Sequence, residues 1–169
     1  TGKTLVSFGE MVGKVKAALD ARASERTLIV ARTDGIAVEG FEAALDRAEA
    51  YLEAGADVLF IEAPASLEQV QAICARFASR VPLLANMVEG GKTPVLTRGD
   101  LAELGFRLII SPGALVRAIT PVMEAFLAEL REQGSSVRWQ DRMLNITQLN
   151  ERLDLSRMLA EGERYAGGD

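Results

Sequence analysis

The chain has 169 residues, of which 49% are hydrophobic and 25% are charged, and its formal net charge is −5. This composition is typical of a folded globular domain and excludes disorder as the default. The acidic balance argues against a nucleic-acid partner, and no apolar run approaches the ~20 residues that cross a membrane. With no histidine and one cysteine, the chain itself contains no Ser-His-Asp triad, no histidine-bound zinc and no internal disulfide. The lone cysteine favours a reducing compartment, so we expect the cytoplasm.

In chain order, the sequence predicts a helix over residues 7–22, a strand over 28–31, a helix over 39–54, a strand over 58–61, a helix over 66–77, a strand over 82–85, a short helix, a strand over 108–110 and a long helix over 114–133. The helical stretches carry apolar residues at three- and four-residue spacing. Gly55 lies where a left-handed C-terminal cap is expected. Ser66, with Gln69 three residues later, predicts a capping box.

The four predicted strands are continuous apolar runs. None alternates polar and apolar residues, which predicts a parallel sheet with strands buried on both faces. They start at residues 28, 58, 82 and 108, so they are 30, 24 and 26 residues apart, and a (β/α)₈ barrel uses ~31 residues per unit. A doubly wound open sheet fits the same spacing. However, residues 32–35 (Arg-Thr-Asp-Gly) are not the glycine-rich phosphate turn that usually follows its first strand.

Four strands make only half of such a barrel, which cannot close because two edges and the inner face stay uncovered. We therefore expect residues 1–133 to be the second half of a (β/α)₈ barrel, with strands near residues 28–34, 57–62, 82–87 and 107–111. This half would pair with an N-terminal half that the sequence lacks. Self-association that completes eight strands is the alternative.

Residues 134–169 form a predicted helical tail. Pro121 lies inside the preceding helix and is expected to kink or divide it, and Trp139 is expected to anchor the tail. The tail carries apolar residues at broadly helical spacing: Met143, Ile146, Leu149, Leu153 and Met158. This stripe must be buried either against the chain's own barrel or against a neighbouring subunit, and the pattern favours neither.

Each predicted strand is followed by a polar residue, in order Arg32, Glu62, Asn86 and Ser111. In a barrel the carboxyl ends of the strands meet at one mouth, where active sites form. Arginine clamps a carboxylate, asparagine donates to it, and glutamate positions a hydroxyl or a metal-bound water. The pattern predicts a site for a small anionic substrate, although each residue taken alone is more often a strand cap or part of a structural salt bridge.

Three further features are weaker indicators of a functional site. Paired glycines between Glu89 and Lys92 fit an anion-binding loop or a tight turn. Arg117 would point towards the same mouth or be a solvated surface arginine. Cys74 lies on an amphipathic helix and is expected to fill the core.

Five motifs resemble the isocitrate lyase/phosphoenolpyruvate mutase superfamily: residues 31–34 (Ala-Arg-Thr-Asp), 37–40 (Ala-Val-Glu-Gly), 51–57 (Tyr-Leu-Glu-Ala-Gly-Ala-Asp), 60–64 (Phe-Ile-Glu-Ala-Pro) and 84–94 (Leu-Ala-Asn-Met-Val-Glu-Gly-Gly-Lys-Thr-Pro). The resemblance runs over essentially the whole chain but covers only the C-terminal part of a member nearly twice as long. It implies a (β/α)₈ barrel whose C-terminal helix is exchanged between subunits, usually in a homotetramer.

The resemblance also implies chemistry next to a carboxylate, in which C–C or P–C bonds are cleaved or formed through enolate intermediates on Mg²⁺. Six residues match substrate-contacting or pocket-lining positions of the family: Arg32, Glu62, Asn86, Met87, Val88 and Arg117. The catalytic cysteine loop of the lyases would lie before Thr1, and the Mg²⁺ ligands in the absent half. We therefore assign no catalytic residue and no metal ligand here and expect this chain alone to be inactive.

Within the superfamily, the chain looks most similar to lyases of 2-methylisocitrate and of alkylmalates, a group that includes sequences named carboxyvinyl-carboxyphosphonate phosphorylmutase. Methylisocitrate lyases carry an arginine where this chain has Ile146, which disfavours a third substrate carboxylate, and Pro112 counts weakly against oxaloacetate. We expect a lyase of a 2-hydroxydicarboxylate (alkylmalate type) that yields a 2-keto acid and a carboxylic acid. The alternatives are a phosphoenolpyruvate mutase-like P–C bond-forming enzyme, an oxaloacetate decarboxylase, and a non-catalytic half-barrel for binding or assembly.

Overall fold

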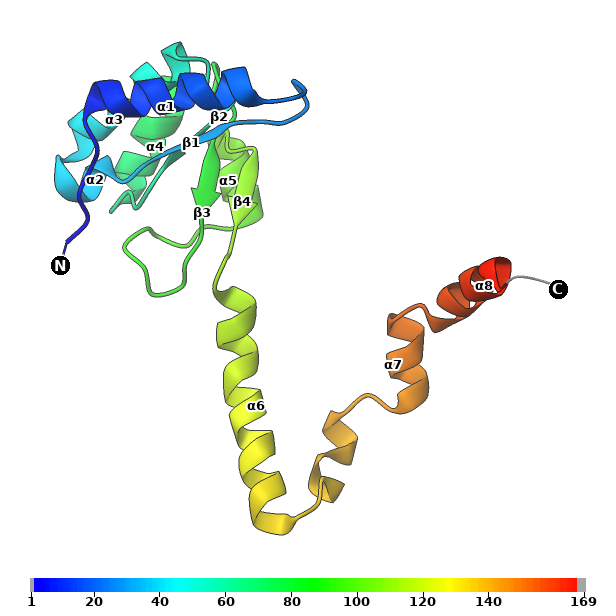
Figure 1. Cartoon of the computed structure of the whole chain (residues 1–169). Coiled ribbons are helices and arrows are strands. Elements are labelled where there is room, and N and C mark those ends of the chain that lie inside the picture. The colour runs from blue at the N-terminus through cyan, green and yellow to red at the C-terminus, as the bar shows by residue number, and fades with distance from the viewer. Residues whose placement is uncertain (1, 167–169) are drawn as a thin grey trace. The chain divides into compact units, whose positions relative to one another are not determined.

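The computed structural model describes residues 2–166 (Figure 1). The chain divides into two compact units, Thr1–Leu115 and Val116–Asp169. The sequence predicts a boundary at residue 133, between the barrel half and the helical tail. That boundary refers to the complete barrel, and it stays a prediction. Among the described residues, no helix combines the length and the apolar character that crossing a bilayer requires.

The first unit alternates helices and strands, as the sequence predicts. In chain order it contains α1 (Phe8–Ala21), β1 (Val30–Thr33), α2 (Gly35–Val38), α3 (Phe41–Glu53), β2 (Val58–Ile61), α4 (Leu67–Phe77), β3 (Leu84–Asn86), α5 (Arg98–Leu104) and β4 (Leu108–Ile110). Each strand overlaps one of the four predicted apolar runs. The four-residue helix α2 is the one element of this unit that the sequence does not predict.

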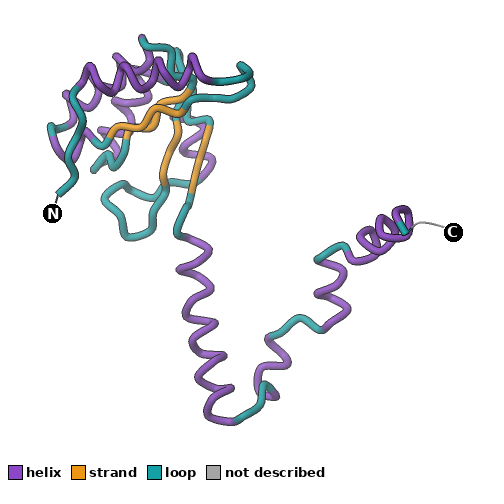
Figure 2. Tube along the Cα trace, in the orientation of Figure 1, coloured by secondary structure: helices purple, strands orange, loops and turns teal. Residues whose placement is uncertain are grey.

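The strands of the first unit, drawn in orange in Figure 2, are parallel to one another by their pairing. β1 pairs with β2 and β3 pairs with β4, and a parallel bridge between Leu59 and Leu83 links the two pairs. The strands therefore follow one another in chain order, and their carboxyl ends lie at the same edge. Among the described residues, β1 and β4 each have a strand partner on one side only.

The core of the first unit lies between the strands and the helices. α3 packs against β1 and β2, and α1 packs on α3. The largest fully buried side chains come from β2, α4, α5 and the segment before β3: Phe77, Leu59, Leu83, Leu101, Val58 and Val70. This apolar burial, worth roughly 25 cal/mol per Å² of area removed from water, is what holds the helices on the strands.

Within this chain, burial of the strands on both faces is confirmed for β2, holds only in part for β3, where Ala85 alone is fully buried, and is wrong for β1 and β4. All four residues of β2 are buried, whereas β1 alternates exposed and buried positions and all three residues of β4 are exposed. Val30 on β1 is 45% exposed and Ile109 on β4 is 39% exposed. The reason is positional, because only the inner strands have neighbours on both sides.

The predicted caps are formed, one of them with a different partner. Gly55 has φ of 103° and follows α3 as a left-handed cap, its N–H donating to the Leu52 carbonyl at 2.9 Å. The Ser66 hydroxyl accepts from the Gln69 N–H at 3.3 Å, as a capping box requires. The Gln69 side chain, however, accepts from the Ala65 N–H at 2.7 Å and not from Ser66 itself.

The second unit is helical. α6 (Ala114–Gln133) enters it and is followed by η1 (Val137–Arg142), α7 (Ile146–Arg152) and α8 (Leu155–Tyr165). The long helix predicted over 114–133 is confirmed, and Pro121 lies inside it without dividing it. Trp139 is buried, meets Phe126 edge to face at 5.4 Å and carries the Arg142 guanidinium over its ring at 3.8 Å. Its predicted role as an anchor is confirmed within this unit.

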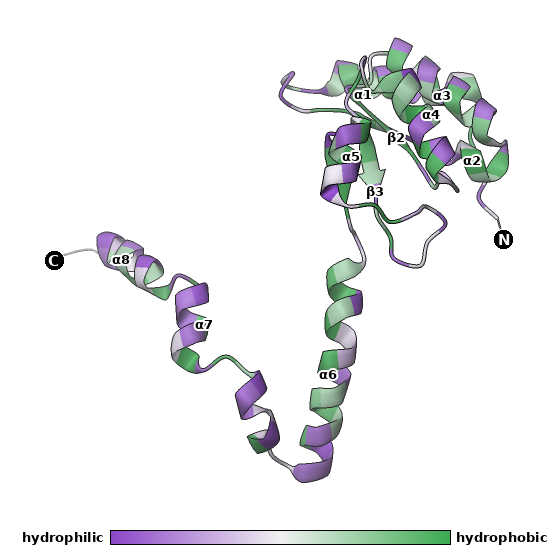
Figure 3. Ribbon diagram, turned by 180° about the vertical axis from the view of Figure 1, so that it is seen from behind, coloured by the Kyte–Doolittle hydropathy of each residue, from purple (hydrophilic) through white to green (hydrophobic). Residues whose placement is uncertain are grey.

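The apolar side chains of the tail remain exposed. Figure 3 shows apolar residues, in green, along α6 and on the helices after it. Helices α6, α7 and α8 contain no buried residue. Ile146 and Leu153 are 71% and 60% exposed. The tail therefore presents an apolar surface that its own helices do not cover.

Candidate active site

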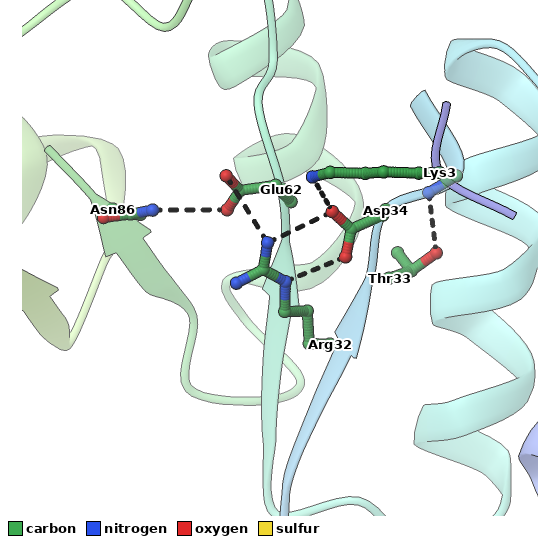
Figure 4. A network of polar contacts seen from close by, with 7 residues as sticks. Lys3, Arg32, Thr33, Asp34, Glu62 and Asn86 are labelled. Atoms are coloured by element: carbon green, nitrogen blue, oxygen red, sulfur yellow. Dashed lines mark hydrogen bonds and ion pairs between the residues drawn. The ribbon is translucent and has the colours of Figure 1, made fainter. Parts of the chain in front are cut away.

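The carboxyl ends of three neighbouring strands bring Arg32, Glu62 and Asn86 together (Figure 4). Arg32 is the third residue of β1, Glu62 directly follows β2, and Asn86 is the last residue of β3. Because the strands are parallel and in chain order, these side chains meet at one edge. Three of the six predicted site residues thus lie in one cluster; their role as substrate contacts stays a prediction.

A continuous set of polar contacts joins these residues. The Arg32 Nη2 lies 3.6 Å from Glu62 Oε1, and the Asn86 amide donates from Nδ2 to Glu62 Oε2 at 3.3 Å. Arg32 also places its guanidinium over the Phe60 ring, 4.8 Å from the centroid. Phe60 is opposite Arg32 in the β1–β2 register, which accounts for this stacking.

Two charged residues that the sequence does not assign to the site complete the cluster. Asp34 accepts two hydrogen bonds from Arg32, from Nε to Oδ2 at 2.9 Å and from Nη2 to Oδ1 at 3.1 Å. The Lys3 ammonium donates to Asp34 Oδ1. We call Lys3, Arg32, Asp34, Glu62 and Asn86 the strand-end network.

The network shifts the pKa values of two of its members, Asp34 and Arg32. The hydrogen bond from Arg32, opposed by partial burial and supported by the hydrogen bond from Lys3, holds the pKa of Asp34 below its ordinary value. The hydrogen bond to Asp34 raises the pKa of Arg32, with a further contribution from the charge of Glu62. Asp34 and Arg32 are therefore both ionised at neutral pH.

Asn86 contains an unusual acceptor. Among the described residues, its Oδ1 is the one buried side-chain oxygen or nitrogen that makes no hydrogen bond. Leaving a buried acceptor unpaired costs about 1–3 kcal/mol. This atom is therefore a position where a donor from outside the described residues would stabilise the protein.

Backbone strain accompanies the network. Ala63 directly follows Glu62 and has φ of 59°, a left-handed conformation that side chains other than glycine rarely adopt. It begins the turn that carries the chain away from β2 towards Pro64. Strained residues of this kind concentrate at functional sites.

Beside the network lies a hollow of about 220 Å³, lined by Glu62, Ala63, Asn86, Val88, Gly91, Lys92 and Thr93. Val88 borders this hollow, and its role as a residue of the substrate pocket stays a prediction. Met87 instead points into the core, 6% exposed, with its sulfur accepting from the Leu96 N–H at 3.5 Å. Met87 therefore links the core to the loop that borders the hollow, through its contact with Leu96.

The glycines of that loop serve a tight turn. Gly90 has φ of 73°. The Gly91 N–H donates to the Val88 carbonyl at 3.0 Å, and a Cβ on Gly91 would lie 2.9 Å from that same oxygen. Of the two interpretations left open by the sequence, the turn accounts for both glycines.

The remaining candidates lie elsewhere. Cys74 is 8% exposed in the core, and burial raises its pKa to about 11. It is thus a poor nucleophile, as predicted. Arg117 lies on α6 in the second unit, so its contribution to the site stays a prediction. Within the described part of the chain, no three His, Cys, Asp or Glu side chains group closely enough to hold a metal ion.

Comparison with known proteins identifies the family. A family model described as phosphoenolpyruvate phosphomutase matches residues 1–131. The chain is 37% identical to the 2,3-dimethylmalate lyase of Eubacterium barkeri, over 99% of this chain and 57% of the relative. It is 45% identical to the 2-methylisocitrate lyase of Aeropyrum pernix, over 87% of this chain and 46% of the relative.

A solved structure extends the match to the fold. The crystal structure of a 2,3-dimethylmalate lyase, described as a member of the PEP mutase/isocitrate lyase superfamily, matches with a TM-score of 0.86 and 31% identity over 99% of this chain and 58% of that chain. The chain thus spans about half the length of the curated relatives it matches. These relatives are named as lyases, and the α/β fold and the sequence of this chain agree with theirs. The chain belongs to the phosphoenolpyruvate mutase/isocitrate lyase superfamily.

Proposed function

We propose that this chain supplies the carboxylate-binding half of a lyase that cleaves a 2-hydroxydicarboxylate of the alkylmalate type into a 2-keto acid and a carboxylic acid. One observation carries the proposal. Arg32, Glu62 and Asn86 come from three neighbouring strands and meet in one network, and Glu62 and Asn86 also line a hollow of about 220 Å³. A cation, a carboxylate and an amide at the carboxyl ends of parallel strands suit a small hydroxylated anion.

Arg32 offers an anion one particular edge. Asp34 accepts from Nε and Nη2, whereas within the described residues Nη1 has no hydrogen-bond partner. The Arg32 side chain is 45% exposed. A substrate carboxylate would bind at Nη1, while Glu62 would accept a hydrogen bond from the substrate hydroxyl. In this position the guanidinium stabilises the negative charge that develops as the C–C bond breaks.

Mg²⁺ belongs to the proposal through the family resemblance, and as a Lewis acid it would stabilise the enolate oxygen. The described residues contain no group of three or more His, Cys, Asp or Glu side chains that could hold a metal ion. We therefore place its ligands in the half of the relatives that this chain does not span, and we derive no step through the ion.

We further propose that the first unit is half of a (β/α)₈ barrel. The open edges of β1 and β4 and the exposed side chains of β4 support pairing with an N-terminal half. The exposed apolar residues of the tail support burial against a neighbouring subunit, in a homotetramer with exchanged C-terminal helices.

A second candidate substrate is 2-methylisocitrate. The 45% identity to a 2-methylisocitrate lyase favours it. Ile146 argues against it, because an aliphatic side chain there cannot neutralise a third carboxylate. A site for a small anion is also compatible with a P–C bond-forming mutase, an oxaloacetate decarboxylase or a non-catalytic binding module.

The test uses the protein that contains this chain together with the preceding half. Release of 2-keto acid from 2,3-dimethylmalate is measured with Mg²⁺ for the wild type, for Arg32→Ala and for the control Arg76→Ala. Arg76 pairs with Asp46 and Glu49 on α3, apart from the strand-end network. We expect kcat/KM to fall about 10- to 100-fold in Arg32→Ala, as for loss of a charged hydrogen bond, and to stay unchanged in the control. Undetectable cleavage by the wild type would contradict the proposal; binding of oxalate without cleavage would favour the binding module.

A further inference from the structure

The carboxylate of Asp34 is diverted from its usual local partner. Asp34 is the N-cap residue of α2, where an aspartate ordinarily accepts from the first backbone N–H groups of the helix, yet it makes no such bond. The Thr33 hydroxyl accepts from the Gly35 N–H instead, at 3.1 Å. Both Asp34 oxygens are thereby left to the side chains of Arg32 and Lys3.

The Arg32–Asp34 contact defines the plane of the guanidinium. Two nearly parallel hydrogen bonds, at 2.9 and 3.1 Å, join the Nε–Nη2 edge to the two carboxylate oxygens. Such a two-point contact fixes orientation as well as distance. The Phe60 ring, 4.8 Å from the guanidinium carbon, supports one face. Together these contacts leave the Nη1 edge for a ligand.

Lys3 balances the charge of this arrangement. Arg32 faces two carboxylates, Asp34 and Glu62, so the three side chains together carry a net negative charge. The Lys3 ammonium on Asp34 brings the sum to zero. Removing it would leave a net negative site, which repels an anionic substrate.

The segment that carries Lys3 is itself held in place. The Arg47 Nη1 donates to the Val6 carbonyl at 3.3 Å. Arg47 is 6% exposed and is clamped by Glu39 through Nε at 2.6 Å and Nη2 at 2.7 Å. Lys3 thus extends to Asp34 from a segment with an anchored backbone.

We infer that Asp34 is a positioning residue that orients Arg32 so that its Nη1 edge meets the substrate carboxylate, and that Lys3 supports it by neutralising the surplus carboxylate charge. The inference rests on the proposed function in that it takes Arg32 as the carboxylate contact. Asp34 itself acts through Arg32.

Asp34→Asn separates orientation from charge. Removing one negative charge makes the network more positive, so a purely electrostatic role predicts tighter binding of anions. Loss of the two-point contact leaves the guanidinium free to rotate, so a positioning role predicts weaker binding. The two roles therefore predict opposite changes in the affinity for anions, and one experiment distinguishes them.

The experiment measures the dissociation constant of oxalate, a planar dianion shaped like the enolate of pyruvate, together with kcat and KM for 2,3-dimethylmalate. We expect Asp34→Asn to weaken oxalate binding and lower kcat/KM by about 10- to 100-fold. Asp46→Asn removes an exposed Asp–Arg pair on the helices and should change neither the oxalate affinity nor kcat/KM.

Lys3→Met tests the charge balance. It should raise KM several-fold at low salt and less at high salt, with kcat unchanged. Lys16→Met, at an exposed position of α1, is its control.

The outcomes separate this inference from the proposed function. Oxalate binding that is unchanged or tighter in a folded Asp34→Asn protein would overturn the inference, whatever the enzyme cleaves. Weaker oxalate binding in a protein that cleaves no alkylmalate would support the inference and overturn the proposed substrate. A wild type that neither binds oxalate nor cleaves would overturn both. The Lys3 side chain is exposed, so Lys3→Met should not disturb folding. It therefore tests the inference even where the Asp34→Asn protein fails to fold.

Discussion

Ala63 is the residue at which the backbone beside the network is strained, since its φ of 59° is costly for any side chain with a Cβ. Ala63→Gly removes that cost, and we expect the free energy of unfolding to rise by ~0.5–1 kcal/mol. Thermal or urea unfolding measures it. Ala102→Gly, in the ordinary helical backbone of α5, is the matched control and should lower the same free energy by about 1 kcal/mol. A fall for both variants would contradict the account of Ala63.

Cys74, also a single residue, predicts how the stability of the folded protein depends on pH. Burial raises its pKa from 9.0 to about 11 in the folded protein. Between these values the unfolded chain loses a proton that the folded chain keeps, so stability should fall as the pH rises from about 9 to about 11. Cys74→Ala should remove this part of the pH dependence. Iodoacetamide should label the native thiol far more slowly than the denatured one at pH 8, and equal rates would show that Cys74 is accessible.

The strand-end network also shows what single residues reveal in a sequence. Arg32, Glu62 and Asn86 follow apolar runs, so their convergence could be predicted from the parallel order of the strands. The sequence indicated Asp34 as a member of the site less clearly. Residues two apart along an extended chain share a face, so the spacing from Arg32 is the one indication. Lys3 gave none, because it reaches Asp34 across 31 residues of sequence through an irregular segment.

Among the elements, the loop between β3 and α5 gives a paired prediction. A Cβ on Gly91 would lie 2.9 Å from the Val88 carbonyl oxygen, whereas a Cβ on Gly99 would meet the Thr97 hydroxyl at an ordinary 3.6 Å. Gly91→Ala should therefore displace the loop beside the hollow and weaken oxalate binding. Gly99→Ala lies in the helix α5 and should leave binding unchanged while raising stability by up to about 1 kcal/mol. Equal oxalate affinity in both variants would mean that the loop does not shape the site.

The elements themselves were largely predictable, and their exposure was not. Continuous apolar runs marked all four strands, and helical periodicity marked α1, α3, α4 and α6. Burial on both faces failed for β1 and β4 because it depends on neighbours that a local pattern does not specify. The short helix α2 was missed because four residues are too few for helical periodicity.

At the scale of the whole molecule, the exposed tail predicts an assembly. Leu153 and Met158 are 60% and 58% exposed, and an apolar stripe of this kind needs cover. Leu153→Glu combined with Met158→Glu should convert the proposed homotetramer into smaller species, measured by light scattering after gel filtration. Arg157→Ala, on a polar position of α8 between them, is the control. An unchanged molar mass in the double variant would contradict burial of the stripe between subunits.

The central claim concerns the substrate of the complete enzyme, and the most direct measurement is the ratio of kcat/KM for 2,3-dimethylmalate to that for 2-methylisocitrate, with Mg²⁺ present. We propose that the strand-end network binds a dicarboxylate. By the family resemblance, Ile146 stands where methylisocitrate lyases carry an arginine, so it would supply no charge for a third carboxylate. We predict a ratio above one, which Ile146→Arg should lower. A ratio below one in the wild type, or cleavage of neither compound, would contradict the assignment to alkylmalates.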